Sequence, residues 1–567
     1  MSHRMMGRKR VSGPQMPFFT FKTTFEGEVS FSITQSGGAL ATWYMGDGTI
    51  IADTNAVTHT YADGTEKTVS VAVEDFGDVT AIGDLREKQI TFFDAKDLND
   101  LSASFTLANN PMASVLMPTS QIGAFSFIQV WSTLLSELNL QGVNFDGLAR
   151  IWAQNCNLSA IAIKSGEVVN DLRLENNDFT TIDLSQVIRN NANTGFQWNF
   201  SESPNLTGVS MPSNNQPQRL GVLRAFSCPL LTEFDISMFS PGGVRTIEFY
   251  NSTGLSSITW PAIDSVNLES NSLRVDDTDI EFIDLRWNTF GFGPGARLWI
   301  MNTPNAKWLK VAPGSVYRFA QQSNNINCLR AENSAIESID FSPAASVSGN
   351  LRVINCPNLT EFLFPADTGT YNPFYIYFIN CPLLTSSLPI GNYAISVITS
   401  QFHVINCPLV TEINCETLDT ITCPSVFIQN TGVTELDFSN WRWNGGTAQV
   451  LMIGNANLQR VVLAEVTGAY SNGWRIVNNP NLTEIEFNGG AGWGVGGNEV
   501  DFRNNALTAQ SIDKLLVDLD NFISTTNKGL RLEGGTNSPP TDGSVTGFDG
   551  IAAKASLELK GMTITTN

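Results

Sequence analysis

The chain has 567 residues and a formal net charge of −21 at pH 7, with 33 Lys and Arg against 54 Asp and Glu. Hydrophobic residues make up 42% and charged residues 15%, so the chain can bury a large core and does not have the composition of a disordered polymer. The acidic balance argues against sequence-specific nucleic-acid binding. No apolar stretch approaches the ~20 residues of a transmembrane helix, so we expect no membrane span.

Residues 1–16 form a basic arm in front of an acidic body. Arg4, Arg8, Lys9 and Arg10 lie in this arm, and no apolar run of the kind found in secretory signals follows them. One interpretation is a solvated tail. The other is an anchor that inserts into a larger assembly. We expect the second, so these four residues are a candidate virion anchor that contacts other virion proteins.

Residues 17–76 alternate between apolar and polar side chains, which is typical of half-buried β-strands. Within them lies the sequence WYMGDGT, beginning at Trp43, and then HTY, ending at Tyr61. This pattern resembles the PKD-type immunoglobulin-like domain, although Met45 stands where that family usually has Phe. The resemblance implies a β-sandwich that acts as a spacer or adhesion module, with Trp43 and Tyr61 in its core and His59 as a framework residue.

Residues 77–505 repeat one unit with a period of roughly 22–26 residues. Clear copies are LRVINCPNLTEFLFP (351–365), FHVINCPLVTEINC (402–415) and WRIVNNPNLTEIEF (474–487). We expect roughly 17 units in all. The pattern resembles the leucine-rich repeat, and its low helical content is similar to the β-rich repeats of Bacteroidetes surface proteins and their phages. The resemblance implies a solenoid whose two long faces are β or irregular.

Strand alternation predicts the orientation of side chains within one unit. Leu351 and Val353 should point inward, and Arg352 and Ile354 outward. Cys356 falls at the position where this fold places a buried Asn, Cys or Thr that bonds the backbone of the next coil. Other residues in this register are Cys156, Asn177, Cys228, Cys381, Cys407 and Asn479. We therefore expect these cysteines to be buried and reduced, whereas Cys328, Cys415 and Cys423 fall outside the register.

Residues 506–567 predict a cap with two helices. Ile512, Leu515, Leu516 and Leu519 share one helical face within 511–519. A second helix is expected over 552–559, with Gly561 just past its end, and a closing strand over 562–565. A solenoid needs such a cap because its last coil would otherwise expose an apolar core and a strand edge. The predicted fold class is therefore mainly β, with an α/β C-terminal cap.

Pairs of carboxylates are the first candidates for catalysis, because glycoside hydrolysis uses two of them. Such pairs are Glu233 and Asp235, Glu435 and Asp437, and Glu484 and Glu486. All fall at the same two repeat positions, which favours a solvated surface over a unique active site. Ser386 and Arg460 interrupt the column of like charges and should relieve its repulsion. No phosphate-loop, nucleophile-elbow or metalloprotease motif is present, so we expect no enzyme activity, no cofactor and no metal ion.

The outward face carries recurring Asn and aromatic residues. Asn occurs just before the buried register position at Asn155, Asn176, Asn251, Asn302, Asn355, Asn380, Asn406, Asn430, Asn455 and Asn478. One interpretation is that these amides bond one another along the array. The other is a polar and aromatic groove for a host glycan or protein. The candidate binding residues are Trp152, Asn176, Tyr250, Trp299, Asn302, Asn355, Tyr375, Tyr377, Asn380, His403, Asn406 and Asn430.

Three functions remain open. The first is a non-enzymatic structural or adhesive protein of a tailed-phage virion, on the head or tail, held by the arm and forming homo-oligomers. The second is a bacterial cell-surface leucine-rich repeat adhesin. The third, a glycan depolymerase tailspike, is least favoured because it needs an acid pair outside the repeat register.

Overall fold

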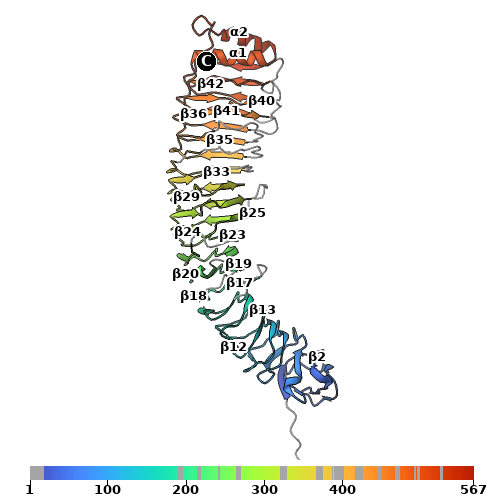
Figure 1. Ribbon diagram of the computed structural model, residues 1–567. Coiled ribbons are helices and arrows are strands. Elements are labelled where there is room, and N and C mark those ends of the chain that lie inside the picture. Colours follow the sequence, from blue (N-terminus) through green and yellow to red (C-terminus); the bar gives the residue numbers. More distant parts are fainter. Residues whose placement is uncertain are drawn as a thin grey trace, which may run out of the picture. The chain divides into compact units, whose positions relative to one another are not determined.

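The computed structural model of the chain describes residues 18–188, 196–212, 219–239, 243–262, 270–319, 328–365, 375–385, 387–388, 401–414, 425–443, 449–466, 473–490, 493, 499–523 and 528–567. Within these residues the chain is mainly β and forms a β-solenoid, as predicted (Figure 1). It divides into two compact units, Met1–Met238 (unit 1) and Phe239–Asn567 (unit 2), which are described separately below. No described helix is long and apolar enough to cross a membrane.

Unit 1 begins with two sheets that share an aromatic core, and their strands are antiparallel except for β10, which pairs parallel with β8. Phe21, Phe31 and Trp43 meet in this core, with ring centroids 4.9 Å apart for Phe21 and Phe31 and 6.4 Å apart for Phe31 and Trp43. One sheet has the order β10 (Ser114–Leu116), β8 (Ile90–Asp94), β1 (Phe18–Thr23), β6 (Lys67–Ala72), β3 (Thr42–Tyr44) and β4 (Ile50–Ile51). The other has the order β5 (Ala56–Tyr61), β2 (Gly27–Gln35) and β7 (Val79–Ile82).

Strands from both sides of residue 77 share these sheets. β1 pairs with β8, so that Phe21 lies opposite Phe93, and β2 pairs with β7. The aromatic contacts then continue from Phe93 to Phe105 (5.5 Å) and from Phe105 to Phe125 (5.9 Å). The first strands therefore close the start of the solenoid core, as a solenoid end requires.

The coils of unit 1 stack as parallel strands. Their main sheet contains β9 (Ala103–Thr106), β11 (Phe125–Gln129), β13 (Phe145–Trp152), β15 (Val169–Arg173), β17 (Gln197–Asn199) and β19 (Arg219–Arg224). Shorter second strands are β12 (Glu137–Leu140) paired with β14 (Ala160–Ile163), β16 (Thr181–Asp183) paired with β18 (Gly208–Ser210), and β20 (Glu233–Asp235).

The strands of unit 2 are also parallel. Its main sheet contains β21 (Gly243–Glu248), β23 (Ser270–Arg274), β25 (Gly291–Met301), β28 (Leu329–Glu332), β31 (Leu351–Ile354), β33 (Tyr375–Ile379), β34 (Gln401–Ile405), β35 (Ser425–Gln429), β38 (Gln449–Ile453), β41 (Trp474–Val477), β43 (Val500–Asp501), β44 (Gly529–Arg531) and β45 (Thr563–Thr565). β27 (Val316–Phe319) and β30 (Ser346–Ser348) pair beside β25.

The second strands of unit 2 form three small parallel sheets and one further strand. The first sheet contains β24 (Phe282–Leu285), β26 (Trp308–Val311), β29 (Ser338–Asp340) and β32 (Glu361–Leu363). The second contains β36 (Glu435–Asp437), β39 (Arg460–Val462) and β42 (Glu484–Glu486). The third pairs β37 (Arg442–Trp443) with β40 (Glu465–Val466). The further strand is β22 (Ser257–Thr259).

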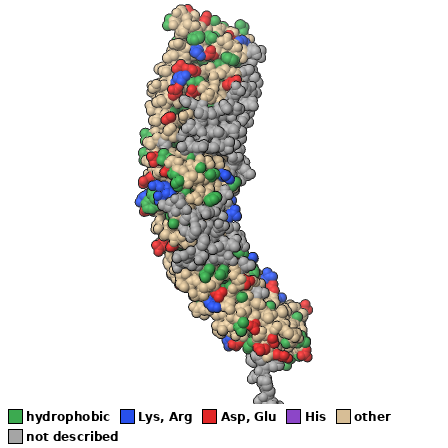
Figure 2. All heavy atoms as spheres, viewed as in Figure 1, with side chains coloured by type: hydrophobic (Ala, Val, Ile, Leu, Met, Phe, Trp, Pro, Cys, Tyr) green, Lys and Arg blue, Asp and Glu red, His purple; other side chains and the backbone are tan. Residues whose placement is uncertain are grey.

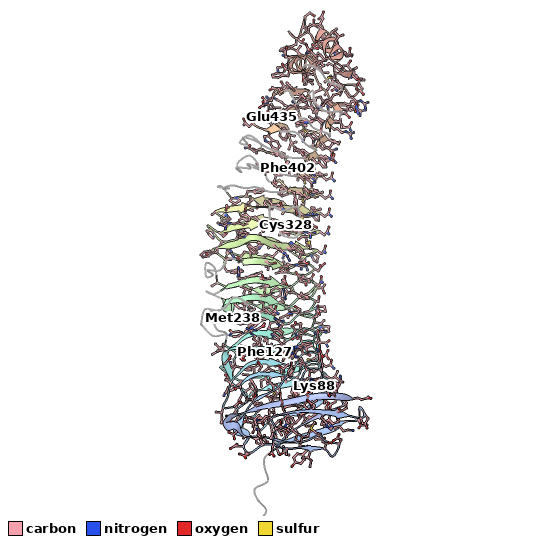
Figure 3. The ribbon with its side chains drawn as sticks, turned by 90° about the vertical axis from the view of Figure 1, so that its right-hand side faces the viewer. Lys88, Phe127, Met238, Cys328, Phe402 and Glu435 are labelled. Atoms are coloured by element: carbon pink, nitrogen blue, oxygen red, sulfur yellow. The ribbon has the colours of Figure 1, made fainter. Side chains whose placement is uncertain are left out.

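Within one coil the predicted orientations hold. In β31, Leu351 and Val353 are buried, whereas Arg352 and Ile354 are partly exposed. Leu351 pairs with Leu329 before it and Ile376 after it, so apolar side chains stack inward from coil to coil. Figure 3 shows the side chains of successive coils in such rows, with the buried Cys328 and Phe402 labelled.

The buried register position holds a column of small polar residues. In unit 2 its members are Ser252, Thr278, Thr303, Ser334, Cys356, Cys381, Cys407, Thr431, Asn455, Asn479 and Asn505, all buried. Two of their side chains bond backbone carbonyls of the preceding coil rather than the next one: Cys356 Sγ donates to Ala331 O (3.1 Å) and Asn479 Nδ2 to Met452 O (3.1 Å). Asn479 Nδ2 also donates to the side chain of Asn505 in the next coil (3.2 Å).

The cysteine predictions are confirmed for the described residues. Those at 156, 228, 328, 356, 381 and 407 are buried and form no disulfide within the described part of the chain. Burial raises the pKa of the Cys228 thiol to about 11 and that of Cys328 to about 12. Cys415 and Cys423 lie outside the described residues.

The residue just before each buried polar position adopts a left-handed backbone conformation. In unit 2 these residues, which we call corner residues, are Asn251, Asp277, Asn302, Asn333, Asn355, Asn380, Asn406, Asn430, Gly454, Asn478 and Asn504. The Asn and Asp members have φ between 51° and 60°. Asn, Asp and Gly are the residues that adopt this region most readily, which explains why Asn recurs in the sequence.

The C-terminal cap has two helices, as predicted. α1 (Ala509–Phe522) buries Ile512, Leu515, Leu516 and Leu519, and its N-cap residue Thr508 accepts a hydrogen bond from the Ser511 backbone. α2 (Gly550–Leu559) begins two residues earlier than expected, with Asp549 as N-cap. β45 pairs with β44 and closes the main sheet of unit 2.

Candidate binding face

The corner amides of unit 2 bond one another, and we call this row the asparagine ladder. In each step the Nδ2 of one residue donates to the Oδ1 of the corner residue in the preceding coil. The steps are Asn333 to Asn302 (3.1 Å), Asn355 to Asn333 (2.8 Å), Asn380 to Asn355 (2.7 Å), Asn406 to Asn380 (2.7 Å) and Asn430 to Asn406 (2.7 Å). All these bonds are exposed. The structure thus brings five of the predicted asparagines together in the way that the first interpretation expects.

Asn455 does not belong to this row, which corrects its placement from the sequence. It is buried at 0% exposure and occupies the inward register position, while Gly454 takes the corner. The sequence pattern misled here because Gly454 fills the left-handed position in place of Asn. The ladder stops at this coil and resumes where Asn504 Nδ2 donates to Asn478 Oδ1 (3.0 Å).

Beside the ladder, outward side chains of the main sheet form a second row, which we call the central column. Its members, in strand register, are Arg274, Trp299, Arg330, Arg352, Tyr377, His403, Phe427 and Leu451. Arginine and aromatic residues contact one another along it. The Arg274 guanidinium lies 3.8 Å from the Tyr250 ring centroid and 4.4 Å from that of Trp299, as in cation–π contacts.

The rings in the middle of the central column stack face to face. Tyr377 and His403 have centroids 4.6 Å apart, and His403 and Phe427 4.2 Å apart with only 1° between the ring planes. This spacing follows from the ~4.8 Å separation of adjacent strands. Because both faces of His403 are covered, a sugar cannot stack on that ring. A ligand of this part of the column would meet ring edges.

Tyr375 is not part of the exposed face, contrary to the sequence-based expectation. Its side chain is 3% exposed and stacks against Tyr377 with centroids 5.2 Å apart. Burial raises the pKa of its phenol. Its strand position is outward, but the neighbouring coils cover it, which strand alternation alone does not predict.

His403 lies half-buried in the stack. Burial lowers the pKa of its imidazole to about 4, so the ring is neutral at pH 7. Its Nε2 has no hydrogen-bond partner among the described residues. Nothing in its contacts therefore orients it as a catalytic base, which needs a positioned partner.

Trp152 and Asn176 belong to unit 1, apart from the other candidates. The guanidinium of Arg173 lies 3.9 Å from the Trp152 ring centroid, and the indole Nε1 donates to Asp171 Oδ2 (2.9 Å). Asn176 Nδ2 donates to Asn155 Oδ1 (3.0 Å). Unit 1 therefore repeats the two motifs of unit 2 on a smaller scale.

The carboxylates of the second strands are bridged by one arginine. Arg460 forms ion pairs with Glu435, with Glu484 (3.6 Å) and with Glu486 (2.9 Å). This confirms the predicted role of Arg460 in relieving like-charge repulsion. Partial burial and the neighbouring Glu486 charge raise the pKa of Glu484. Ser386 lies outside the described residues.

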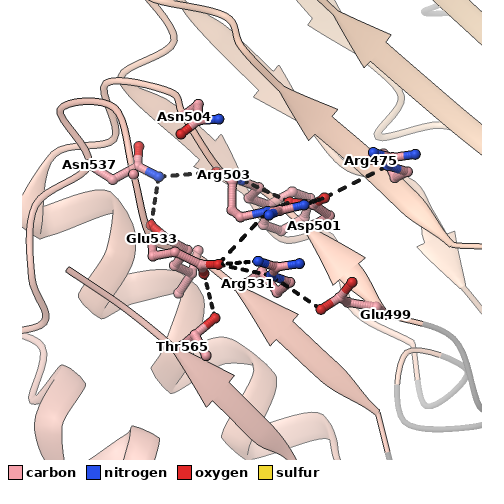
Figure 4. A network of polar contacts seen from close by, with 12 residues as sticks. Arg475, Glu499, Asp501, Arg503, Asn504, Arg531, Glu533, Asn537 and Thr565 are labelled. Carbon is pink, nitrogen blue, oxygen red and sulfur yellow. Dashed lines mark hydrogen bonds and ion pairs between the residues drawn. The ribbon is translucent and has the colours of Figure 1, made fainter.

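A larger ionic network lies near the C-terminal end of unit 2 (Figure 4). Asp501 accepts two bonds from Arg503, both 2.8 Å, and Arg475 lies 3.7 Å away. Burial alone would raise the pKa of Asp501, but the paired arginine outweighs it and holds the pKa below its usual range. Arg531 links Glu499 (3.3 Å) to Glu533 (2.6 Å).

Sequence reasoning missed these arginine–acid pairs although a signal was present. An arginine and an acid stand two residues apart at 171–173, 274–276, 330–332, 501–503 and 531–533. Residues two apart on a strand share one face, so this spacing predicts the pairs. Within the described residues, no group of three or more His, Cys, Asp or Glu side chains is arranged to hold a metal ion.

The surface hollows are lined by residues other than the candidate binding residues. Two of them, of about 470 Å³ and about 420 Å³, lie on unit 1 near the ends of its second strands, and both touch Gln141. No motif in the sequence marked this region. The candidate face of unit 2 is instead built from rows of side chains in strand register. Figure 2 shows acidic and basic side chains next to one another toward the C-terminal end of unit 2.

No protein-family model, curated protein or solved structure matches this chain. Arg4, Arg8, Lys9 and Arg10 lie outside the described residues. A functional assignment for unit 2 therefore has to be argued from the asparagine ladder and the central column.

Proposed function

We propose that the chain is a non-enzymatic structural and adhesive protein of a tailed-phage virion, which presents the face of unit 2 to a host surface glycan. The observation that carries the binding part is the asparagine ladder, which repeats one exposed amide per coil. A surface that repeats every ~4.8 Å suits a polymer whose own polar groups also repeat. Many weak contacts to one polymer would then add up through avidity.

The ladder keeps hydrogen-bonding capacity for a ligand. Each amide has two N–H donors and an oxygen with two lone pairs. Asn380, for example, donates once to Asn355 and accepts once from Asn406, which leaves one donor and one lone pair. Adjacent ladder amides can thus bond the hydroxyl groups of a glycan chain, while ring edges of the central column contact its apolar parts.

We also propose that the coils are leucine-rich repeats and that the first strands are a PKD-like immunoglobulin sandwich. The second proposal is supported by contacts of the motif residues. Tyr61 Oη donates to Met45 O (2.9 Å), and His59 Nε2 lies 2.7 Å from Asp47 Oδ2. Trp43 is buried and its Nε1 donates to Thr54 O (2.9 Å). An experimental structure of the full chain tests the strand order.

The glycan proposal is tested by removing ladder amides without straining the backbone. Glycine already stands at one corner, Gly454, so Asn380→Gly together with Asn406→Gly should leave the coil path unchanged. We expect this double variant to lose at least about tenfold in affinity for host cells or their purified surface glycan. The measurement is binding to immobilised glycan, with circular dichroism confirming the fold.

The matched control is Asn109→Gly, which removes an amide at a left-handed position of unit 1 where the side chain bonds Glu87 rather than another asparagine. It should bind as the parent chain does. Equal binding by the double variant and the parent would exclude the ladder as the glycan site. Release of soluble oligosaccharide from the glycan by the parent chain would contradict the non-enzymatic assignment.

The virion assignment is tested separately with the arm. The full chain and a chain lacking residues 1–17 are each mixed with purified particles stripped of this protein. We expect only the full chain to associate, because the basic arm would insert among other virion proteins. Equal association of both chains, or of neither, would reject the anchor and favour the bacterial surface adhesin.

A further inference from the structure

The helix α2 lies beside α1 at the C-terminal end of unit 2 (Figure 1). It is apolar on two faces. One face, with Ala553 and Leu557, is buried, and α2 packs against α1. The other face is exposed. It carries Ile551 (54% exposed) and Leu559 (91% exposed), with Ala552 and Ala555 between them. We call these four residues the α2 stripe.

Single exposed apolar residues are normal, but a row of them is not. Ile551, Ala555 and Leu559 are spaced by four residues, so they lie on one side of the helix. Leu559 protrudes almost fully into solvent. A surface helix normally places polar residues at such positions, so the α2 stripe is built to be covered.

We infer that the α2 stripe is an interface between two copies of this chain, formed by two antiparallel α2 helices with a two-fold axis beside Ala555. The spacing is symmetric about that residue. Rotation by 180° places Ile551 of one copy against Leu559 of the other, and Ala555 against itself. The small alanine side chains at the crossing point allow the two backbones to approach closely.

The charges at the edge of the stripe fit the same arrangement. Lys554 and Glu558 lie on one flank of α2, with Nζ and Oε1 3.9 Å apart within one chain. Their side chains are 28% and 46% exposed. A two-fold axis of this kind brings equal flanks together in reverse order. Lys554 of each copy therefore meets Glu558 of the other, and both contacts are attractive.

A single pair of ten-residue helices buries less than the ~1,200 Å² of a stable complex. The association should therefore be reversible, with a dissociation constant on the order of 10 to 100 μM. Sedimentation velocity of the full chain over a concentration series measures it. A chain that stays monomeric at millimolar concentration overturns the inference.

Leu559→Glu places a charge against Ile551 of the other copy and should weaken dimerisation at least about tenfold. The control is Leu383→Glu, at another exposed leucine (45%) on a coil of unit 2, which should leave the dimer unchanged. Lys554→Glu alone should weaken the dimer, and Lys554→Glu with Glu558→Lys should restore it. If the dimer forms equally well with Leu559→Glu, its interface lies elsewhere on the chain and the proposed arrangement is wrong.

Cysteine cross-linking tests the symmetry axis directly. Ala555→Cys should form a disulfide-linked dimer under mild oxidation, because the axis places the two sulfurs together. Leu559→Cys should not link to itself, since the two copies of residue 559 lie ~12 Å apart along the helix axes. The parent chain, with its native cysteines, supplies the background. Self-linking of both variants to the same extent would rule out the antiparallel register.

Discussion

The corner asparagines combine two requirements in one side chain. The backbone at Asn380 has φ of 56°, and the amide bonds both neighbours in the ladder. Aspartate would meet the first requirement, but a row of carboxylates would repel. Glycine adopts the left-handed conformation but has no amide to bond its neighbours, so the ladder is interrupted at Gly454. Asparagine is the one residue type here that satisfies both at low cost.

Substitution at Asn380 separates the two requirements. We expect Asn380→Ala to lower the free energy of unfolding by about 2 kcal/mol, because alanine loses the amide bonds and is strained at positive φ. Asn380→Gly should cost about 1 kcal/mol, since only the bonds are lost. Urea titration followed by tryptophan fluorescence measures both. Equal stabilities of the two variants would contradict this explanation.

His403 should make the protein less stable in mild acid. Its pKa is about 4 in the fold, against an ordinary value of 6.5 for a histidine side chain. Between pH 6.5 and 4 the unfolded chain therefore binds a proton that the folded chain does not, and stability falls as the pH falls. The full effect is about 3 kcal/mol.

His403→Phe keeps the stack and removes the titrating group. The difference in unfolding free energy between this variant and the parent should grow in favour of the variant as the pH falls from 6.5 to 4. Urea titrations at several pH values measure this difference. If the unfolding free energies of the two chains change with pH in the same way, His403 does not cause the loss of stability in acid.

At the scale of strands, the second-strand sheet of β36, β39 and β42 depends on a single cation. Arg460 is flanked in register by Glu435 and Glu484 and also contacts Glu486. Replacing it by glutamine leaves three acids side by side. We expect Arg460→Gln to destabilise the protein by about 1 kcal/mol at low salt, a small value because the arginine side chain is 34% exposed.

The salt dependence distinguishes this effect from lost packing. Added sodium chloride screens the repulsion, so the difference between Arg460→Gln and the parent should shrink. Thermal melts at low and high salt measure it. A salt-independent difference would indicate that the aliphatic part of Arg460 supplies the stability.

Periodic features of the elements were predictable, and pairings between distant segments were not. The alternation in β31 and the buried face of α1 follow from local spacing that the sequence displays directly. The pairing of β1 with β8 joins residues some seventy positions apart, and no local pattern encodes it. The face-to-face stacking of Tyr377, His403 and Phe427 likewise depends on side-chain rotation, which alternation leaves open.

At the scale of the whole molecule, the reactivity of the cysteine thiols measures how tightly the core is packed. The chain has eight cysteines, and six of them are buried. We expect at most two thiols, those of Cys415 and Cys423, to react rapidly with a disulfide reagent under native conditions, because burial raises thiol pKa values and blocks access. All eight should react in concentrated guanidinium chloride. Fast reaction of more than two would contradict the packing of the buried column.

The repeated corner also determines how this molecule can change in length. The corner residues of unit 2 have equivalent left-handed backbone conformations. The segment between two corners can therefore be deleted or duplicated without changing the backbone at the junction. Removing residues 356–380 would join Asn355 to Cys381, which keeps the Asn-Cys order already present at 355–356, 380–381 and 406–407. Recombination between the gene segments that encode two coils would shorten or lengthen the array in steps of one coil, ~4.8 Å each. Because the corners are equivalent, the length of the solenoid can change by whole coils while the packing of its core stays the same.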